Sequence, residues 1–457
     1  MLALVLGGCS GAATDDELRK AWLVEALADD NRVWLSRDPA LLGAKYAKMA
    51  ADPYDYLRGT AGVTFRDRAR AGSDRSHTIF LRDAEAVEVL LAGDPHPENM
   101  GTFRPADLVV LELNDFDGSA FGPYLLDVQR LALGLLYLAD EAGYEPHDAA
   151  LVVDAAARGY LEAVAGDPWP SGLVPGQQGV VLDQLLSKVS DDGAARARLL
   201  EYTEVLPEGG RRFRFDAALE AGAGVLPLTI DQGRQLDRLL ASWSAAPEGF
   251  RVLDRGRRFG SGVASLPSVR YVVAYDLGDD GPDDDALVSI REVVDPPAVP
   301  GVHVGAPGYW DSGADRIEAT ARTLWSRADA DPRYAGLTDG AMTFKVQTWA
   351  SWHDSFDHER VLSDIARGRV VLDELVRWAG TLGQLLGSAH ARAPTARGGE
   401  ARAAILRDLN SQGEVFVAEI IGTARADLDQ LRTDHRLFVE AREELGDLLG
   451  MGLVEDR

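Results

Sequence analysis

Two short polar segments of the sequence carry the residue types that transfer of a phosphoryl group requires. Asp94 and Asn99 lie five positions apart in the first segment, and Asp115 and Asp117 lie in the second. In such a reaction one carboxylate deprotonates the attacking group, while an amide oxygen and another carboxylate hold Mg²⁺ against the donor phosphates. Asn and Asp supply the oxygen ligands that Mg²⁺ prefers. The spacing therefore predicts Asp94 as general base and Asn99 and Asp115 as metal ligands, with Asp117 either a second metal ligand or a turn residue.

Two further residues are predicted to support these segments rather than react. His96 lies inside the first segment, and a single histidine there is expected to orient the loop. Arg58, in Leu57-Arg58-Gly59, is expected either to contact a phosphate or to pair with a loop aspartate, in the simplest case as a buried structural ion pair. The sequence alone leaves both readings of Arg58 open.

A nucleotide-binding part should add a glycine-rich hairpin and a basic residue on a nearby strand. Gly260, Gly262 and Ser265 precede two predicted strands at 269–275 and 286–290, and Arg291 ends the second of these. Glu318, in a helix predicted over 314–327, is expected to hold Arg291 as a helix glutamate holds the lysine in protein kinases. Ser265 stands where a third glycine would be, and arginine is a planar fork rather than a compact charge.

The order of these segments resembles that of aminoglycoside phosphotransferases and related small-molecule kinases, in which Gly-x-Pro and Asp open the next helix. That resemblance implies that Asp127 braces the catalytic loop. The chain from about residue 40 to 445 resembles more closely the bacterial domain of unknown function 2252 family, itself similar to kinase-like phosphotransferases. The matching pieces are Lys48-Met49, Pro53-Tyr54, Leu57-Arg58-Gly59, Gly93–Gly101, Asn114–Asp117, Gly122–Leu131, Ile290-Arg291-Glu292 and Ala389-His390-Ala391-Arg392.

Predicted helices and strands segregate along the chain, which indicates an α+β fold. The expected parts are 1–16, a lipoprotein-type signal and tether; 17–250, a mixed segment and helical lobe with the catalytic-type loop; 251–350, a strand-rich nucleotide-type lobe; and 351–457, C-terminal helices. The resemblance implies a two-lobed protein-kinase-like fold. Because the glycine hairpin follows the catalytic loop, the two lobes would come in permuted order.

Composition limits the function classes. The 457 residues include 47 Lys and Arg against 73 Asp and Glu, a formal charge of −26. Such a chain repels phosphate backbones, so nucleic acid is not an expected partner. We also find no G-x-S-x-G motif that would indicate a hydrolase.

The single cysteine, Cys9, follows an apolar run and two glycines and precedes a small polar stretch. This pattern resembles the lipoprotein box of bacteria, in which the cysteine is lipidated, and it predicts attachment to a membrane of the cell envelope. Only eight residues precede Cys9 and none is basic, which is short for a signal peptide. The alternative is an ordinary N-terminus and a cytoplasmic protein.

Two functions remain open from the sequence. The first is a phosphotransferase that uses ATP and Mg²⁺ and acts on an unknown small-molecule or protein acceptor. The second is a catalytically degenerate kinase-like protein, a binding or scaffold protein of the cell envelope, because Arg291 and Ser265 depart from the kinase pattern.

Overall fold

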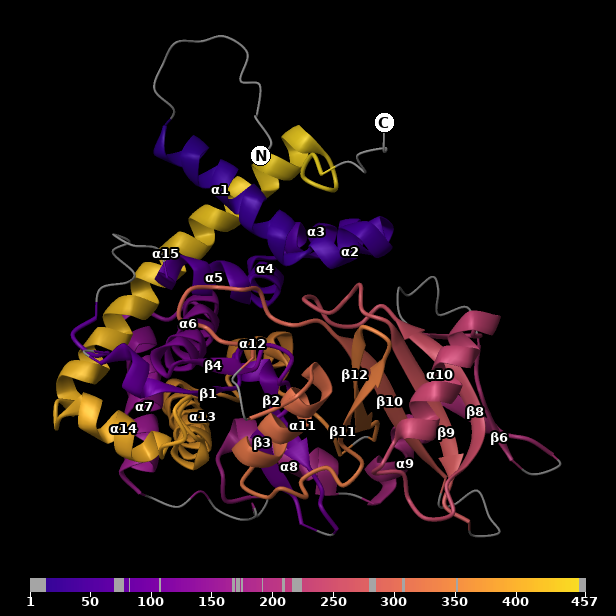
Figure 1. Ribbon diagram of the computed structural model, residues 1–457. Coiled ribbons are helices and arrows are strands. Elements are labelled where there is room, and N and C mark those ends of the chain that lie inside the picture. Colours follow the sequence, from indigo (N-terminus) through magenta and orange to yellow (C-terminus); the bar gives the residue numbers. More distant parts are fainter. Residues whose placement is uncertain are drawn as a thin grey trace.

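We describe a computed structural model of the chain (Figure 1). It describes residues 14–69, 78–81, 83–106, 108–166, 169, 173, 176–190, 192–207, 210–215, 224–278, 285–305, 309–350 and 352–451. Cys9 and most of the predicted tether lie outside the described residues.

The helical part is built around α6 (Leu125–Glu141), whose residues are buried on almost all sides. Helices α7 (Pro146–Ala165), α13 (Leu372–Arg392) and α15 (Gly413–Leu445) pack around it, and α14 (Ala401–Leu409) packs on α7 and α13. The pair α7 and α13 approach closely because glycines line their contact: a Cβ on Gly383 would lie 2.0 Å from the carbonyl oxygen of Ala156. This close packing supports the loops that carry the two polar segments.

An antiparallel sheet of six strands forms the second part, at the right of Figure 1. Its spatial order is β11-β12-β10-β9-β8-β7. The bounds are β7 (Gly224–Leu226), β8 (Arg251–Phe259), β9 (Arg270–Asp276), β10 (Ala286–Val293), β11 (Ala335–Asp339) and β12 (Met342–Thr348). Helix α10 (Ile230–Ser242) covers one face through Leu236, Leu239 and apolar strand residues such as Ile290. Strand residues alternate between faces, so Arg291, the neighbour of Ile290, lies on the other face.

Two small antiparallel ladders join the parts and hold the polar loops. Strand β1 (Glu88–Leu91) pairs with β4 (Ala120–Pro123), and β2 (Met100–Phe103) pairs with β3 (Val110–Leu113). The first polar segment, including the short 3₁₀ helix η3 (Pro97–Asn99), connects β1 to β2, and the second connects β3 to β4. All four strands are almost wholly buried, which anchors both loops at each end.

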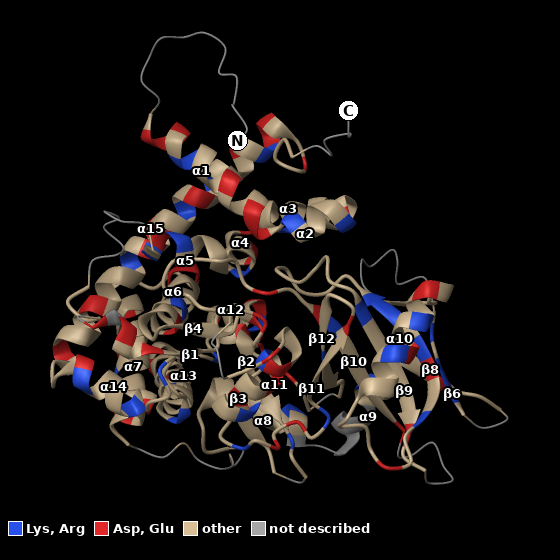
Figure 2. Cartoon of the chain, viewed as in Figure 1, with Lys and Arg blue, Asp and Glu red and all other residues tan. Residues whose placement is uncertain are grey.

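The remaining elements cover these parts. At the top of Figure 1 lie α1 (Asp15–Asp30), α2 (Arg32–Arg37), α3 (Pro39–Ala51), α4 (Pro53–Gly59) and α5 (Ala61–Ala69). The others are η2 (Ala84–Val87), α8 (Val180–Ser190), α9 (Asp192–Tyr202), β5 (Thr203–Val205), β6 (Arg211–Phe213), α11 (Gly313–Leu324) and α12 (His358–Ala366). Acidic and basic residues are interspersed along the helices (Figure 2). Within the described part of the chain, no helix has the length and apolar character needed to cross a bilayer.

The α+β class is confirmed, with differences in detail. The sequence between residue 176 and about residue 243 favours helices, yet β5, β6 and β7 lie there. These strands are three residues long, too short to show a two-residue period in the sequence. Strand β7 and helix α10 belong with the six-stranded sheet, so that part begins before residue 251. The sequence of residues 78–81 also favours a strand, but these residues form none.

Candidate functional site

Residues far apart in the sequence meet in one cavity of about 230 Å³, called here the central cavity. Its lining includes most of the residues singled out in the sequence: Asp94, His96, Asn99, Asp115, Asp117, Arg58, Gly262, Ser265 and Arg291. The polar loops come from the small ladders, and Arg291 comes from β10 of the large sheet. Tertiary structure therefore brings together the catalytic-type loop and three of the predicted nucleotide-binding residues, Gly262, Ser265 and Arg291, whereas Gly260 and Glu318 do not line this cavity.

The catalytic-type loop holds Asp94 and Asn99 in a defined orientation. The side-chain nitrogen of Asn99 donates to the main-chain carbonyl of Asp94 at 2.9 Å. This leaves Oδ1 of Asn99 as the atom able to contact a cation. The Asp94 carboxylate accepts from Nε of Arg130 at 2.5 Å, and Arg130 also donates to the Leu57 carbonyl at 2.5 Å. Arg130 is a fully buried residue of α6, so its guanidinium holds the Asp94 carboxylate in one orientation.

Asp127 braces the loop, in agreement with the role that the resemblance implied. Its buried carboxylate accepts from the amides of Ala92 (2.7 Å) and Gly93 (3.1 Å). His390 of α13 contacts the same carboxylate through Nε2 at 3.2 Å, and its Nδ1 contacts the Tyr160 hydroxyl at 3.0 Å. Both ring nitrogens of His390 are thus occupied, and it is a core histidine.

Asp115 and Asp117 form a compact ion cluster with Arg291 and a residue missed in the sequence, Lys345. Nζ of Lys345 lies 2.9 Å from one carboxylate oxygen of each aspartate. The Arg291 guanidinium lies 3.1 Å from Asp115 and 2.7 Å from Asp117. Lys345 is on β12, directly opposite Arg291 of β10 in the antiparallel register. The sheet therefore presents two adjacent cations to the two carboxylates.

The ionisation of this pair follows from its surroundings. Burial by itself would raise the pKa of Asp115, but Lys345 and Arg291 outweigh it and hold that pKa well below its usual value. Burial and the charge of Asp115 raise the pKa of Asp117 despite the opposing effect of Arg291. Two neighbouring carboxylates titrate as a coupled pair. The cations thus keep Asp115 firmly ionised.

The glycine-rich hairpin lies against Arg270, which is opposite Arg291 in the register of β9 and β10. Gly260 and Gly262 have positive φ angles, 77° and 81°, which residues with side chains rarely adopt. Arg270 of β9 holds the turn: it donates to the Ser261 hydroxyl at 3.0 Å and to the Ser265 hydroxyl at 2.6 Å. Ser265, standing in place of a third glycine, therefore has a structural partner.

Glu318 differs from expectation. It pairs with Arg322 of its own helix at 3.0 Å and accepts from the Gly336 amide at 3.1 Å. Arg291 takes Asp115 and Asp117 as partners instead. The prediction of an ion pair between Glu318 and Arg291 is therefore wrong. The residue of α11 that reaches the loop is Arg316, whose Nη1 donates to the main-chain carbonyl of Asp117 at 3.1 Å.

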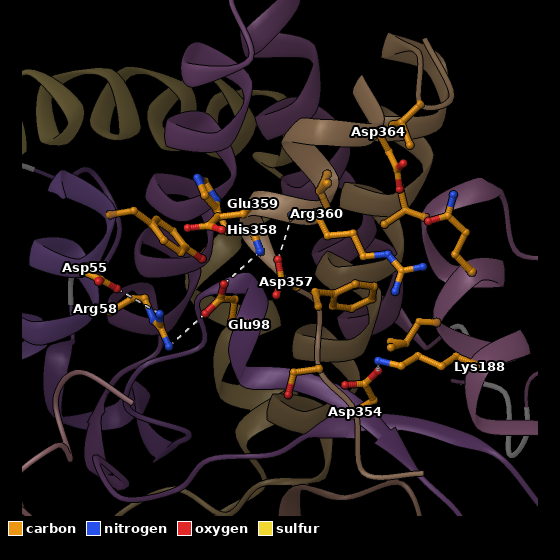
Figure 3. Close-up of a pocket in the computed structure, with 18 of the residues that line it drawn as sticks. Asp55, Arg58, Glu98, Lys188, Asp354, Asp357, His358, Glu359, Arg360 and Asp364 are labelled. Atoms are coloured by element: carbon orange, nitrogen blue, oxygen red, sulfur yellow. Dashed lines mark hydrogen bonds and ion pairs between the residues drawn. The ribbon is translucent and has the colours of Figure 1, made fainter. Parts of the chain in front are cut away.

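Arg58 separates the central cavity from a larger one of about 590 Å³, called here the outer cavity (Figure 3). It donates to Asp55 at 3.1 Å and pairs with Glu98 at 3.0 Å. Arg58 therefore forms ion pairs, but its partners are Asp55 of α4 and Glu98 rather than an aspartate of the loop, and its side chain is 24% exposed. Its position at both cavities leaves contact with a ligand open. Figure 3 shows further charged side chains around this cavity, including Lys188 paired with Asp354.

With this geometry established, comparison with known proteins identifies the family. A family described as "Uncharacterized protein conserved in bacteria (DUF2252)" matches residues 37–441. The chain belongs to this family. No curated protein and no solved structure matches it. The resemblance predicted over about residues 40–445 is confirmed.

The oxygen atoms of this family member's central cavity suit a magnesium ion. Asp115, Asp117 and Oδ1 of Asn99 are oxygen donors, and Mg²⁺ is commonly bound by one or two carboxylates together with substrate phosphates. Within the described ranges, no group of three or more His, Cys, Asp or Glu residues is placed to hold a metal.

His96 makes the catalytic-type loop sensitive to acid. Burial lowers its pKa from 6.5 to about 4, with Asp94 opposing. The folded state thus binds fewer protons than the unfolded state between these values, so its contribution to stability is complete above pH 6.5 and is lost as the pH falls to 4. We expect wild type to lose roughly 3 kcal/mol more than His96→Asn over this interval. Urea unfolding at several pH values measures this, with exposed His147→Asn as control; parallel curves for wild type and His96→Asn would contradict it.

Proposed function

We propose that the protein is a kinase-like phosphotransferase that moves the γ-phosphoryl group of ATP, with Mg²⁺, to a hydroxyl or amine of an unknown acceptor. One observation carries the proposal: Asp94 and Asn99 line the same cavity as the ion cluster of Asp115, Asp117 and Arg291. Phosphoryl transfer needs a base, oxygen ligands for magnesium and cations for the phosphates, all within reach of one another.

Each residue has a role in this mechanism. Asp94 accepts the proton of the acceptor as the acceptor attacks the γ-phosphorus and the bond to the leaving ADP oxygen breaks. Oδ1 of Asn99 and the carboxylates of Asp115 and Asp117 would hold Mg²⁺, and the ion would supply positive charge against the phosphates. Arg291 stabilises the transferring group by charge.

The order of elements supports the kinase-like reading. A protein kinase carries its glycine-rich loop, then a lysine on the third strand, then the helix glutamate. Here the β8–β9 turn, Arg291 on β10 and helix α11 come in the same order, although β10 is the fourth strand of its sheet and Glu318 of α11 pairs with Arg322. Lys345, on the strand beside β10, restores the compact ammonium that Arg291 cannot supply.

A comparison of wild type with Lys345→Met tests this function. Mg-ATP should raise the thermal midpoint of wild type, because a ligand stabilises the state that it binds, and ADP should form slowly even with water as acceptor. Lys345→Met should lower ADP formation at least tenfold. Lys20→Met, whose partner Glu444 lies at the protein surface, is the matched control. Absence of both stabilisation and ADP formation in wild type would exclude the proposal.

A second candidate is a binding or scaffold protein of the same fold. The observation in its favour is that Arg291 and Lys345 already neutralise Asp115 and Asp117, so the cluster is satisfied without a ligand. Stabilisation by Mg-ATP without ADP formation would favour this candidate. Attachment to the cell envelope through Cys9 belongs to the same proposal, and mass spectrometry of the N-terminus in the native host tests it: an unmodified Met1 would eliminate the anchor.

A further inference from the structure

Four basic residues form a row across four neighbouring strands of the large sheet. Arg270, Arg291 and Lys345 are directly opposite one another on β9, β10 and β12. On β8, Arg257 pairs with Tyr271, which places the next residue, Arg258, beside Arg270. Opposed residues of antiparallel strands point to the same face, and all four side chains line one cavity of about 280 Å³. We call these residues the cation row and this space the sheet-side cavity.

Two members of the cation row have no carboxylate partner among the described residues. Arg270 is 9% exposed, its Nη atoms donate to the two serines of the hairpin, and its Nε has no partner within the described part of the chain. Arg258 lies over the Trp349 ring at 4.8 Å. A buried charge without a counter-charge is costly. Burial, then Arg291 and Arg258, lower the pKa of Arg270 to about 9.

The rest of the sheet-side cavity does not remove this excess. Its carboxylates are Asp115 and Asp354, and the second of these pairs with Lys188 outside the row. Asp115 is shared between Arg291 and Lys345. Arg198 adds a further cation to the lining and donates to the Ala350 carbonyl at 2.9 Å. Among the described residues no carboxylate forms an ion pair with the row at its β8 and β9 end, although Glu201 is close enough to act on Arg258, and Asp115 and Asp117 on Arg270.

We propose that the cation row binds a linear polyphosphate chain through its phosphates alone, with Arg258 and Arg270 providing two subsites beyond Arg291 and Lys345. Neighbouring strands are about 4.8 Å apart, so the row is about 14 Å long. A single phosphate reaches two neighbouring strands, whereas a chain of phosphates can contact the entire row. The ligand class is a triphosphate or longer chain, free or as part of a nucleotide. This inference rests on the proposed function in one respect: both place phosphates of the ligand at Arg291 and Lys345.

Isothermal titration with sodium tripolyphosphate in magnesium-free buffer tests the proposal. We expect tripolyphosphate to bind at least tenfold more tightly than orthophosphate, and adenosine not to compete with it. Arg258→Gln should weaken tripolyphosphate at least tenfold, and Arg258→Lys, which keeps the charge, less. Arg257→Gln is the matched control, because Arg257 is adjacent on β8 and points to the opposite face. Circular dichroism verifies that each variant is folded.

The outcomes separate this inference from the proposed function. Unchanged tripolyphosphate affinity in Arg258→Gln, or affinity no higher than that of orthophosphate, overturns the inference even if ADP is formed from ATP. Binding that depends on Arg258 without any ADP formation upholds the inference and removes the phosphotransferase. If adenosine competed with tripolyphosphate, the site would recognise the base rather than the phosphates alone, and the inference would also be overturned.

Discussion

Asp94→Asn is expected to lower phosphoryl transfer by about 10²–10⁴-fold, the usual contribution of a positioned general base. The amide cannot accept the proton of the acceptor, whereas Oδ1 of the new asparagine can still accept from Arg130. The cation row is untouched, so affinity for tripolyphosphate and for Mg-ATP should change little. Turnover and ligand affinity measured on the same preparation give the result.

The interpretation of Asp94→Asn depends on Arg130, which is fully buried and would lose its formal counter-charge. Loss of one partner of a buried ion pair costs about 3–5 kcal/mol, so some loss of stability is expected and turnover must be measured well below the unfolding midpoint. Asp140→Asn is the matched control, because Asp140 is an acidic residue of the same helix α6 that pairs with Arg432 at the surface. Turnover within twofold of wild type in Asp94→Asn would remove Asp94 from the mechanism.

Asp127→Ala should destabilise the protein by about 3–5 kcal/mol. The change removes the acceptor of two loop amides, Ala92 and Gly93, and the partner of His390, all at a fully buried position. Buried groups left without partners carry the full cost of their desolvation. We expect turnover to disappear together with stability, because the loop that carries Asp94 begins at these amides.

Urea unfolding of Asp127→Ala, Asp127→Asn and wild type measures this effect. The asparagine variant keeps one acceptor oxygen and should lose less stability than the alanine variant. Asp127→Ala should impair folding and tripolyphosphate binding together. Asp94→Asn should leave tripolyphosphate binding intact, so the two variants distinguish a structural role from a catalytic one. A loss below 1 kcal/mol in Asp127→Ala would show that the loop is held by other contacts.

The residues proposed to carry the chemistry could be selected from the sequence, because they lie in short local segments. The Asp94–Asn99 loop and the Asp115–Asp117 pair are each bounded by buried strands, and their residue types are those that magnesium and phosphates require. The brace formed by Asp127 was foreseen only through the family resemblance. The positive φ angles of Gly260 and Gly262 agree with a local turn that the sequence itself indicates.

The partners of those residues were decided only by tertiary structure. Lys345 and Arg258 have no local motif, and they enter the site because antiparallel register places them in one row with Arg291. The sequence held one signal for Lys345, because lysine occurs only five times in the chain. Each of Lys45, Lys48, Lys188 and Lys345 lines one of the three cavities. Arg130 and Arg316 reach the loops from α6 and α11 because helix packing aims them there. Short-range spacing in the sequence thus indicated which groups are proposed to react. Long-range strand pairing decided which charged side chains face those groups, because cross-strand neighbours are set by register and not by distance along the chain.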